Sequence, residues 1–265
     1  MFNKMATEPI PARVFALYKL VQDKGSIRRQ DLKDLMEPTE LNQGKTSYFN
    51  SVVIAAQELG LIKESDGFLS SLIDKKEIKT IADFRYYVIG KMEQLSDGDF
   101  YKVTGTILNC NEKILQLGKV SDTGVRSMLQ SRIGTNFSAP ELRGWRFWAQ
   151  FMGFGYMQDI KFLPNAYVFV KNILPRCGWE KNESIPIGEF LDQIGSFYKE
   201  LVKISPSGNC LNMSFSSALR ELHDFGEIEL QNNKDRQESR ILYPLKDSSF
   251  FNAPVTDVIY REVKL

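Results

Sequence analysis

The sequence predicts a mostly α-helical fold of the α+β class, in which small β-hairpins close three tandem units. A stretch with helical apolar spacing ends near a glycine and continues into an extended run at three places, residues 52–64, 145–157 and 217–230. The first two copies share the pattern Ala-Gln-x-apolar-Gly-apolar, and the third is a looser version. A glycine past the last helical turn can adopt the left-handed conformation that stops a helix, so each copy predicts a helix that leads directly into a hairpin.

The first unit, residues 1–76, is predicted as a helix, a short helix, a third helix and a hairpin. Apolar residues at three-to-four spacing indicate the helices, and Glu37-Pro38 closes the second because proline disfavours helix in the residue before it. Ser65-Asp66-Gly67 predicts the hairpin turn, since Asp-Gly supplies the positive φ angles of a tight turn. The helices are expected at residues 11–22, 29–36 and 46–59, and the strands at 61–64 and 68–72.

The middle unit, residues 77–175, is predicted to contain four helices, followed by the extended run after Gly153. Ser121-Asp122 is typical of an N-cap, and Ser138 caps the last helix, whose first turn accommodates Pro140. The helices are expected at 81–95, 99–116, from Ser121-Asp122 to Gly134, and from Ser138 to Met152. The last of them has one broad apolar face and takes the place of a recognition helix; that face carries Leu142, Trp145, Trp148 and Met152.

The last unit, residues 176–265, is predicted with helices over 186–198 and 214–224. Strands are expected at 228–230 and 241–243, with one more in 255–263. The polar tip from Gln231 to Ser239 between the first two strands predicts a longer hairpin than that of the first unit.

Helix, short helix, helix and hairpin within the first 72 residues resemble the winged helix-turn-helix modules of bacterial transcriptional regulators, and the later units resemble divergent copies. The resemblance implies three tandem winged-helix units with small β-hairpin wings. The layout, together with the run Ala218–Leu230, also resembles accessory proteins of bacterial phage-defence or DNA-modification operons, such as the deazapurine-in-DNA clusters. That second resemblance implies an accessory role in antiviral genome defence.

Charge is distributed unevenly along a chain whose formal net charge is only +1. Residues 1–76 hold 11 basic and 10 acidic residues, 77–175 hold 12 and 9, and 176–265 hold 11 and 14. Because Lys and Arg supply sequence-independent affinity for DNA, we expect the first two units to bind DNA and the acidic third to dock a protein partner. No stretch approaches the roughly 18 to 20 apolar residues of a membrane span, which predicts a cytoplasmic protein without membrane contact.

Enzymatic motifs are absent from the sequence. There is no GxGxxG after a strand, no Walker A loop, no GxSxG elbow and no HExxH helix. The single histidine, His223, is interpreted as structural or solvated, and the widely separated Cys110, Cys177 and Cys210 as buried reduced thiols. We therefore expect no catalytic residue, cofactor or metal.

The residues expected to contact DNA lie at the two predicted reader helices. In the middle unit, Arg143, Arg146 and Gln150 follow i, i+3, i+7 spacing opposite the tryptophan face, and Arg126 and Arg132 on the preceding helix would add phosphate contacts. A solvated helix face is the alternative interpretation. In the first unit, the free N–H groups at the start of the third helix are expected to bind phosphate; the alternative is that the Ser, Thr and Asn side chains there only cap the helix. The side chains expected to contact DNA in this unit are Arg28, Arg29, Lys45, Thr46, Tyr48 and Asn50.

The dense aromatic run from Trp145 to Tyr156 allows two interpretations. Core packing is favoured, since large aromatic residues dominate core burial, and base stacking in a single-strand binder is the alternative. Duplex DNA is accordingly the expected ligand. The sequence thus predicts a non-catalytic DNA-binding protein. The near-neutral charge favours the alternative, a winged-helix adaptor that docks proteins without touching DNA.

Overall fold

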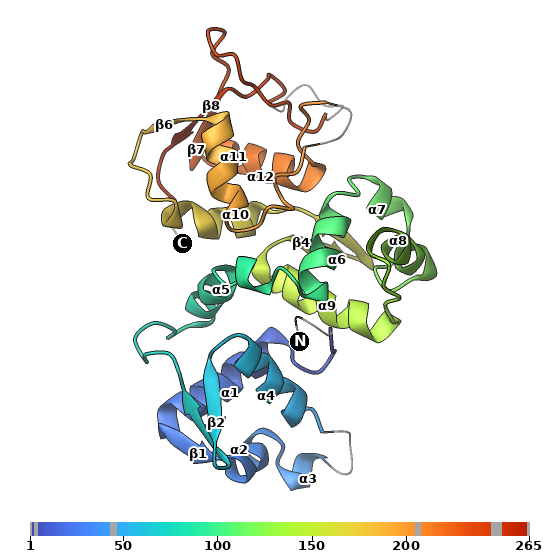
Figure 1. Cartoon of the computed structure of the whole chain (residues 1–265), viewed down its shortest axis with the longest axis vertical. Coiled ribbons are helices and arrows are strands. Elements are labelled where there is room, and N and C mark those ends of the chain that lie inside the picture. The colour runs from blue at the N-terminus through green and yellow to red at the C-terminus, as the bar shows by residue number, and fades with distance from the viewer. Residues whose placement is uncertain (1, 3–4, 43–46, 205–207, 245–250, 264–265) are drawn as a thin grey trace.

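The computed structural model describes residues 2, 5–42, 47–204, 208–244 and 251–263. It is a mixed α+β structure with three small antiparallel sheets. Figure 1 shows three motifs following one another along the longest axis. We name them the N-terminal motif (Pro11–Ser71), the central motif (Asp99–Pro164) and the C-terminal motif (Tyr167–Tyr260).

The N-terminal motif confirms the predicted helix, short helix, helix and hairpin. Its elements are α1 (Pro11–Lys24), β1 (Ser26–Arg28), α2 (Arg29–Met36), α3 (Thr39–Asn42), α4 (Phe49–Glu58), β2 (Ile62–Ser65) and β3 (Phe68–Ser71). The sequence did not predict β1 or α3. Strand β1 joins the hairpin, so the antiparallel sheet has the order β1-β3-β2.

The central motif follows a connecting helix, α5 (Ile81–Ile89), and a short 3-10 turn. Its elements are α6 (Asp99–Leu108), α7 (Lys113–Gln116), α8 (Thr123–Ile133), α9 (Ala139–Met152), β4 (Gly155–Gln158) and β5 (Lys161–Pro164). The predicted start of α9 is confirmed by a capping box, in which Ser138 and Glu141 bond each other's backbone N–H. Unlike the other two sheets, β4-β5 has two strands among the described residues.

Two helices predicted in this region are shorter than expected. The helix expected over 81–95 ends at Ile89, followed by a 3-10 turn over Glu93–Leu95. The helix expected over 99–116 is interrupted after Leu108, because Asn109 turns its side-chain amide back to the Gly105 carbonyl and Asn111 has a φ of 52°.

The C-terminal motif repeats the order of the first. Its elements are α10 (Tyr167–Ile173), a 3-10 turn (Leu174–Arg176), β6 (Ser184–Pro186), α11 (Ile187–Gly195), α12 (Met213–Asp224), β7 (Ile228–Gln231) and β8 (Asp257–Tyr260). The sheet order β6-β8-β7 matches β1-β3-β2. Helix α10 packs against α12, so the predicted boundary at 175–176 separates two helices that pack together.

The predicted strand over 241–243 is wrong. Strand β7 pairs with β8, which lies within the additional strand expected over 255–263. The chain between them folds back over the motif instead of forming the nearest hairpin. Arg220 anchors this long connection, because its buried guanidinium donates to the carbonyl oxygens of Phe251 and Tyr243.

The helix-to-hairpin corner has the same hydrogen bonds in all three motifs. Gly60, Gly153 and Gly226 have φ angles of 67°, 83° and 69°. The N–H of the next residue bonds back to a carbonyl in the last helical turn, in the pairs Leu61–Ala56, Phe154–Ala149 and Glu227–Leu222. The carbonyl of that same residue then accepts from the residue after the last strand, in the pairs Leu72–Leu61, Asn165–Phe154 and Arg261–Glu227. The repeat predicted from the three glycine-ended helices is therefore present in the backbone.

The first residues of the chain connect the N-terminal and central motifs. The buried ring of Phe2 lies edge-on to those of Phe100 and Trp148, with centroids 5.3 and 5.1 Å apart. The indole N–H of Trp148 donates to the Pro9 carbonyl at 2.7 Å. Within the described parts of the chain, no helix has the length and apolar character needed to cross a membrane.

Candidate nucleic-acid interface

The open side of α9 carries the three residues predicted on it. Arg143 is exposed, and Arg146 and Gln150 are half-buried. Trp145 and Trp148, on the opposite side of the helix, are fully buried. The predicted division of α9 into an aromatic inner face and a polar outer stripe is therefore confirmed.

Arg143 and Arg146 line a common pocket of about 270 Å³ together with Lys119. It lies between the turn before α8, the first half of α9 and the tip of the β4–β5 hairpin, where Asp159 is the one carboxylate among the lining residues described. In the part of the chain that the structure describes, the side chains of Arg143 and Lys119 have no hydrogen-bond or ion-pair partner. The Nε atom of Arg146 is buried and equally unpartnered. Three cations against one carboxylate make this pocket favourable for an anion.

The corresponding pocket of the N-terminal motif, about 500 Å³, lies between the start of α2, the start of α4 and the hairpin tip. Arg28, Arg29 and Lys33 line it. Arg29 is already engaged, because its guanidinium pairs with Glu64 at 2.5 Å and donates to Asn50 Oδ1 at 2.9 Å. The pocket has two other cations, exposed Arg28 and half-buried Lys33. Neither is paired with an acid among the described residues.

The start of α4 is occupied by a carboxylate from within the chain, so the expectation of free N–H groups there is wrong for Tyr48 and Phe49. Both N–H groups donate to Glu37 Oε1, at 2.5 and 2.8 Å, and Ser47 Oγ donates to Glu37 Oε2 at 2.6 Å. Burial opposes the charged form, but these three hydrogen bonds dominate and lower the pKa of Glu37. A phosphate would have to displace a bonded carboxylate from these two groups.

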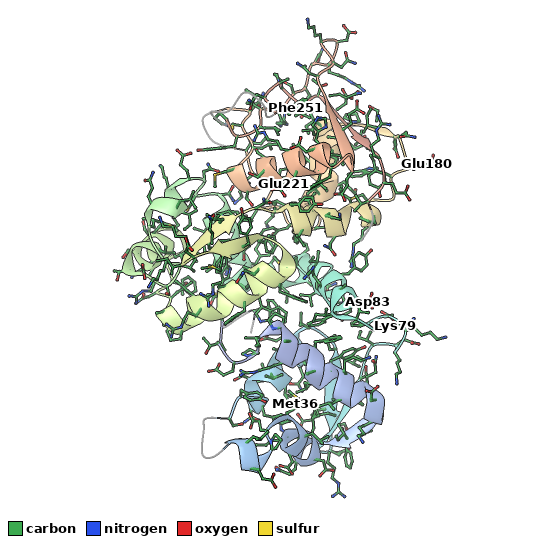
Figure 2. The ribbon with its side chains drawn as sticks, turned by 180° about the vertical axis from the view of Figure 1, so that it is seen from behind. Met36, Lys79, Asp83, Glu180, Glu221 and Phe251 are labelled. Carbon is green, nitrogen blue, oxygen red and sulfur yellow. The ribbon has the colours of Figure 1, made fainter. Side chains whose placement is uncertain are left out.

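Tyr48 itself is half-buried and holds α2 in place. Its hydroxyl donates to the carbonyl of Met36, at the end of α2 (labelled in Figure 2), and its ring lies 4.2 Å from the Arg13 guanidinium. Lys45 and Thr46 lie outside the described residues. Of the residues predicted in the first unit, the structure therefore brings Arg28, Arg29 and Asn50 to one pocket.

Arg126 and Arg132 on α8 do not join the pocket beside α9. Arg126 is half-buried, and its guanidinium donates to Thr123 Oγ1 at 3.3 Å within its own helix. Arg132 is exposed at the far end of α8. Six residues apart, the two side chains point about 120° away from each other around the helix axis, so they do not form one contact surface.

The aromatic run of α9 belongs mainly to the core. Trp145, Trp148 and Phe154 are fully buried, and Trp145 Nε1 donates to Thr104 Oγ1 at 2.9 Å. Phe147 remains 37% exposed beside the polar outer stripe of α9. Core packing, the favoured interpretation, holds for the buried members, which cannot stack bases.

The C-terminal motif has a largely acidic pocket beside α11. A pocket of about 540 Å³ beside α11 is lined by Glu189, Asp192 and Glu238 and by a single cation, Arg240, which pairs with Glu238 at 2.6 Å. His223 serves the fold, because its Nδ1 accepts the Leu230 N–H at 3.3 Å.

The three cysteines are free thiols. Cys110 is buried and the other two are half-buried, so burial is complete for one of the three. Burial raises the pKa of the Cys177 thiol to about 12, which disfavours a nucleophilic thiolate. Among the described residues, no group of three or more His, Cys, Asp or Glu side chains is placed to hold a metal ion.

Three residues at these sites were missed by sequence reasoning: Lys33, Glu37 and Lys119. No local sequence pattern marks Lys33 or Lys119 as a site residue, since tertiary packing brings them to the pockets. Glu37 is expected only as a helix end before Pro38, and its hydrogen bond to the Tyr48 N–H spans 11 residues, so no local capping pattern indicates it. Comparison of the chain with protein-family models, curated proteins and solved structures gives no match.

Proposed function

We propose that this chain is a non-catalytic DNA-binding protein of three tandem winged helices, and that its N-terminal and central motifs contact duplex DNA. The single observation that carries the proposal is the position of Arg143 and Arg146, which line one pocket on the open side of α9 with no bonded acid among the described residues. Arginine forms bidentate hydrogen bonds with phosphate and with guanine edges. Helix α9 occupies the place of the reader helix in a winged helix.

The C-terminal motif takes a different role in this proposal. Its acidic pocket would repel phosphate, and Phe225 beside α12 is 67% exposed, so we assign it to docking a protein partner. The accessory role in bacterial genome defence or DNA modification, which the resemblance of the layout implies, is part of the same proposal.

The test is fluorescence anisotropy of the purified chain with random duplex and single-stranded DNA across a salt series. Arg143→Ala/Arg146→Ala should weaken duplex binding at least tenfold and flatten its salt dependence, since each lost phosphate contact removes about one unit of the slope of log K against log[salt]. The matched control is Lys76→Ala/Lys79→Ala, which removes the same charge from the exposed linker before α5, where Figure 2 labels Lys79. Circular dichroism checks that each variant is folded.

The second candidate is a winged-helix adaptor that docks proteins and does not touch DNA. The near-neutral net charge favours it, as do the exposed apolar side chains of Leu35 and Phe68 on the N-terminal motif and of Leu72 directly after it. Absence of binding to duplex and single-stranded DNA at low salt would replace the DNA-binding proposal with this one.

A further inference from the structure

The pockets of the N-terminal and central motifs lie at equivalent positions in two motifs of different sequence. Each is bounded by the chain that enters α2 or α8, by the first half of the glycine-ended helix, α4 or α9, and by the hairpin tip. Each hairpin tip carries an exposed aspartate with positive φ, 51° for Asp66 and 54° for Asp159. The equivalence therefore extends from the backbone hydrogen bonds of the corner to the residue type at the tip.

The cations of the two pockets come from different positions. In the N-terminal motif, Arg28 and Lys33 are supplied from β1 and α2. In the central motif, Lys119 comes from the turn before α8, and Arg143 and Arg146 come from α9. Two sets of side chains that are unrelated in sequence thus give the same sign of charge at one structural position.

The nearest counterpart in the C-terminal motif has the opposite sign. Its pocket is bounded by α11, by Val202 and Ile204 and by the connection between β7 and β8, and none of its described lining residues comes from the glycine-ended helix α12. Glu189 and Asp192 remain as acids there after Glu238 has paired with Arg240. Among the described residues, the pocket nearest to this position in the C-terminal motif is acidic, so the cationic pocket is a feature of the first two motifs.

We propose that the two cationic pockets each seat one phosphate of a DNA backbone, and that the acidic pocket of the C-terminal motif does not. This inference rests on the proposed function, and it names the side chains that contact the phosphates of the DNA backbone. A phosphodiester offers two unesterified oxygens, which accept charge-assisted hydrogen bonds from lysine and arginine. Lys119 and Lys33 position the backbone and read no base, so their contribution is independent of DNA sequence.

The experiment measures duplex affinity by anisotropy, from about 50 to 200 mM salt, for single Lys→Gln variants. Each of Lys119→Gln and Lys33→Gln should lower the salt slope by about 0.9 and the affinity about fivefold to tenfold near 0.1 M salt, equally on duplexes of unrelated sequence. The matched control, Lys79→Gln, removes the same charge from the linker and should leave the slope unchanged.

The aspartates at the tips give a test in the opposite direction. Asp159→Asn and Asp66→Asn each remove the carboxylate from a pocket, and asparagine tolerates the left-handed conformation of both positions. Each should raise duplex affinity severalfold. Asp192→Asn, the corresponding change beside α11, should leave it unaltered.

Two outcomes overturn the inference and can be told apart. If the unsubstituted chain binds duplex DNA but Lys119→Gln and Lys33→Gln bind as it does, the phosphate seats are wrong and the proposed function stands. If the unsubstituted chain binds no DNA at low salt, the proposed function and the inference fall together.

Discussion

Gly144 of α9 lies so close to Ala6 that a Cβ atom at position 144 would be 2.2 Å from the Ala6 carbonyl oxygen. The neighbouring indole of Trp148 bonds the Pro9 carbonyl. The segment before α1 therefore passes directly over one side of α9 and holds the N-terminal motif against the central motif. This contact leaves the other side of α9, with Arg143 and Gln150, open.

Gly144→Ala should destabilise the fold by about 1–3 kcal/mol, because the Ala6 backbone must move to admit a methyl group. In an exposed helix the same substitution would stabilise by up to about 1 kcal/mol, since alanine is the better helix former. Urea unfolding, with the slope checked for two-state behaviour, separates the two signs. A gain in stability would show that the segment does not pack on α9.

The three corner glycines should respond to alanine in a graded way. Gly226→Ala has open space around the new Cβ, and Gly60→Ala has only the Tyr87 hydroxyl at 3.6 Å, so each should cost about 1–2 kcal/mol for its left-handed backbone alone. Gly153→Ala should cost more, because its Cβ would lie 2.5 Å from Val168 Cβ and 2.6 Å from the Phe169 nitrogen. Thermal unfolding of the three variants gives the order, and equal losses would contradict it.

Glu37 should make stability depend on pH in the acid range. Burial raises its pKa, but the bonds from Ser47, Tyr48 and Phe49 lower it further, so its folded pKa lies below the unfolded value of about 4.3. Its contribution is therefore present above about pH 4.3 and is lost as pH falls through the folded pKa. Glu37→Gln should cost about 1–2 kcal/mol at pH 7, and the deficit should shrink towards pH 3. A deficit that is constant with pH would contradict this assignment.

Tyr198→Phe should weaken the attachment of the C-terminal motif to the central motif. The buried Tyr198 hydroxyl donates to the Tyr101 carbonyl at 2.9 Å, and its removal deletes this buried hydrogen bond at a cost of about 0.5–1.5 kcal/mol. The control is Tyr156→Phe, which changes an exposed ring and should stay within about 0.5 kcal/mol. Equal values for the two variants, measured in urea, would contradict the role of this hydrogen bond.

Sequence reasoning predicted most where the signal is local. The cap at Ser138, the stop at Gly153 and the turn at Asp66 each depend on neighbouring residues, and the structure has all three. The spacing of Arg143 and Arg146 placed them on one helix face for the same reason. Local patterns could also indicate that the three corners repeat, since each copy of the pattern spans only about 13 residues.

Features that depend on distant partners could not be predicted. Strand β7 pairs with β8 across a connection of 25 residues, from Asn232 to Thr256, whereas the hairpin rule favoured the nearer 241–243. The short strands β1 and β6 have three residues each and exist through their pairing with β3 and β8. Lys119 joins Arg143 only because the turn before α8 folds beside α9.

The passage of the first residues over α9 means that the N-terminal motif is attached to the rest of the chain twice. One attachment is the covalent linker from Leu72 to Thr80, with exposed Lys76; the other is non-covalent packing, which includes Phe2 against Trp148 and Phe15 of α1 against Phe84 of α5. A single peptide-bond nick after Lys76 would therefore leave two pieces that stay associated and co-elute under native conditions, and that separate only in denaturant.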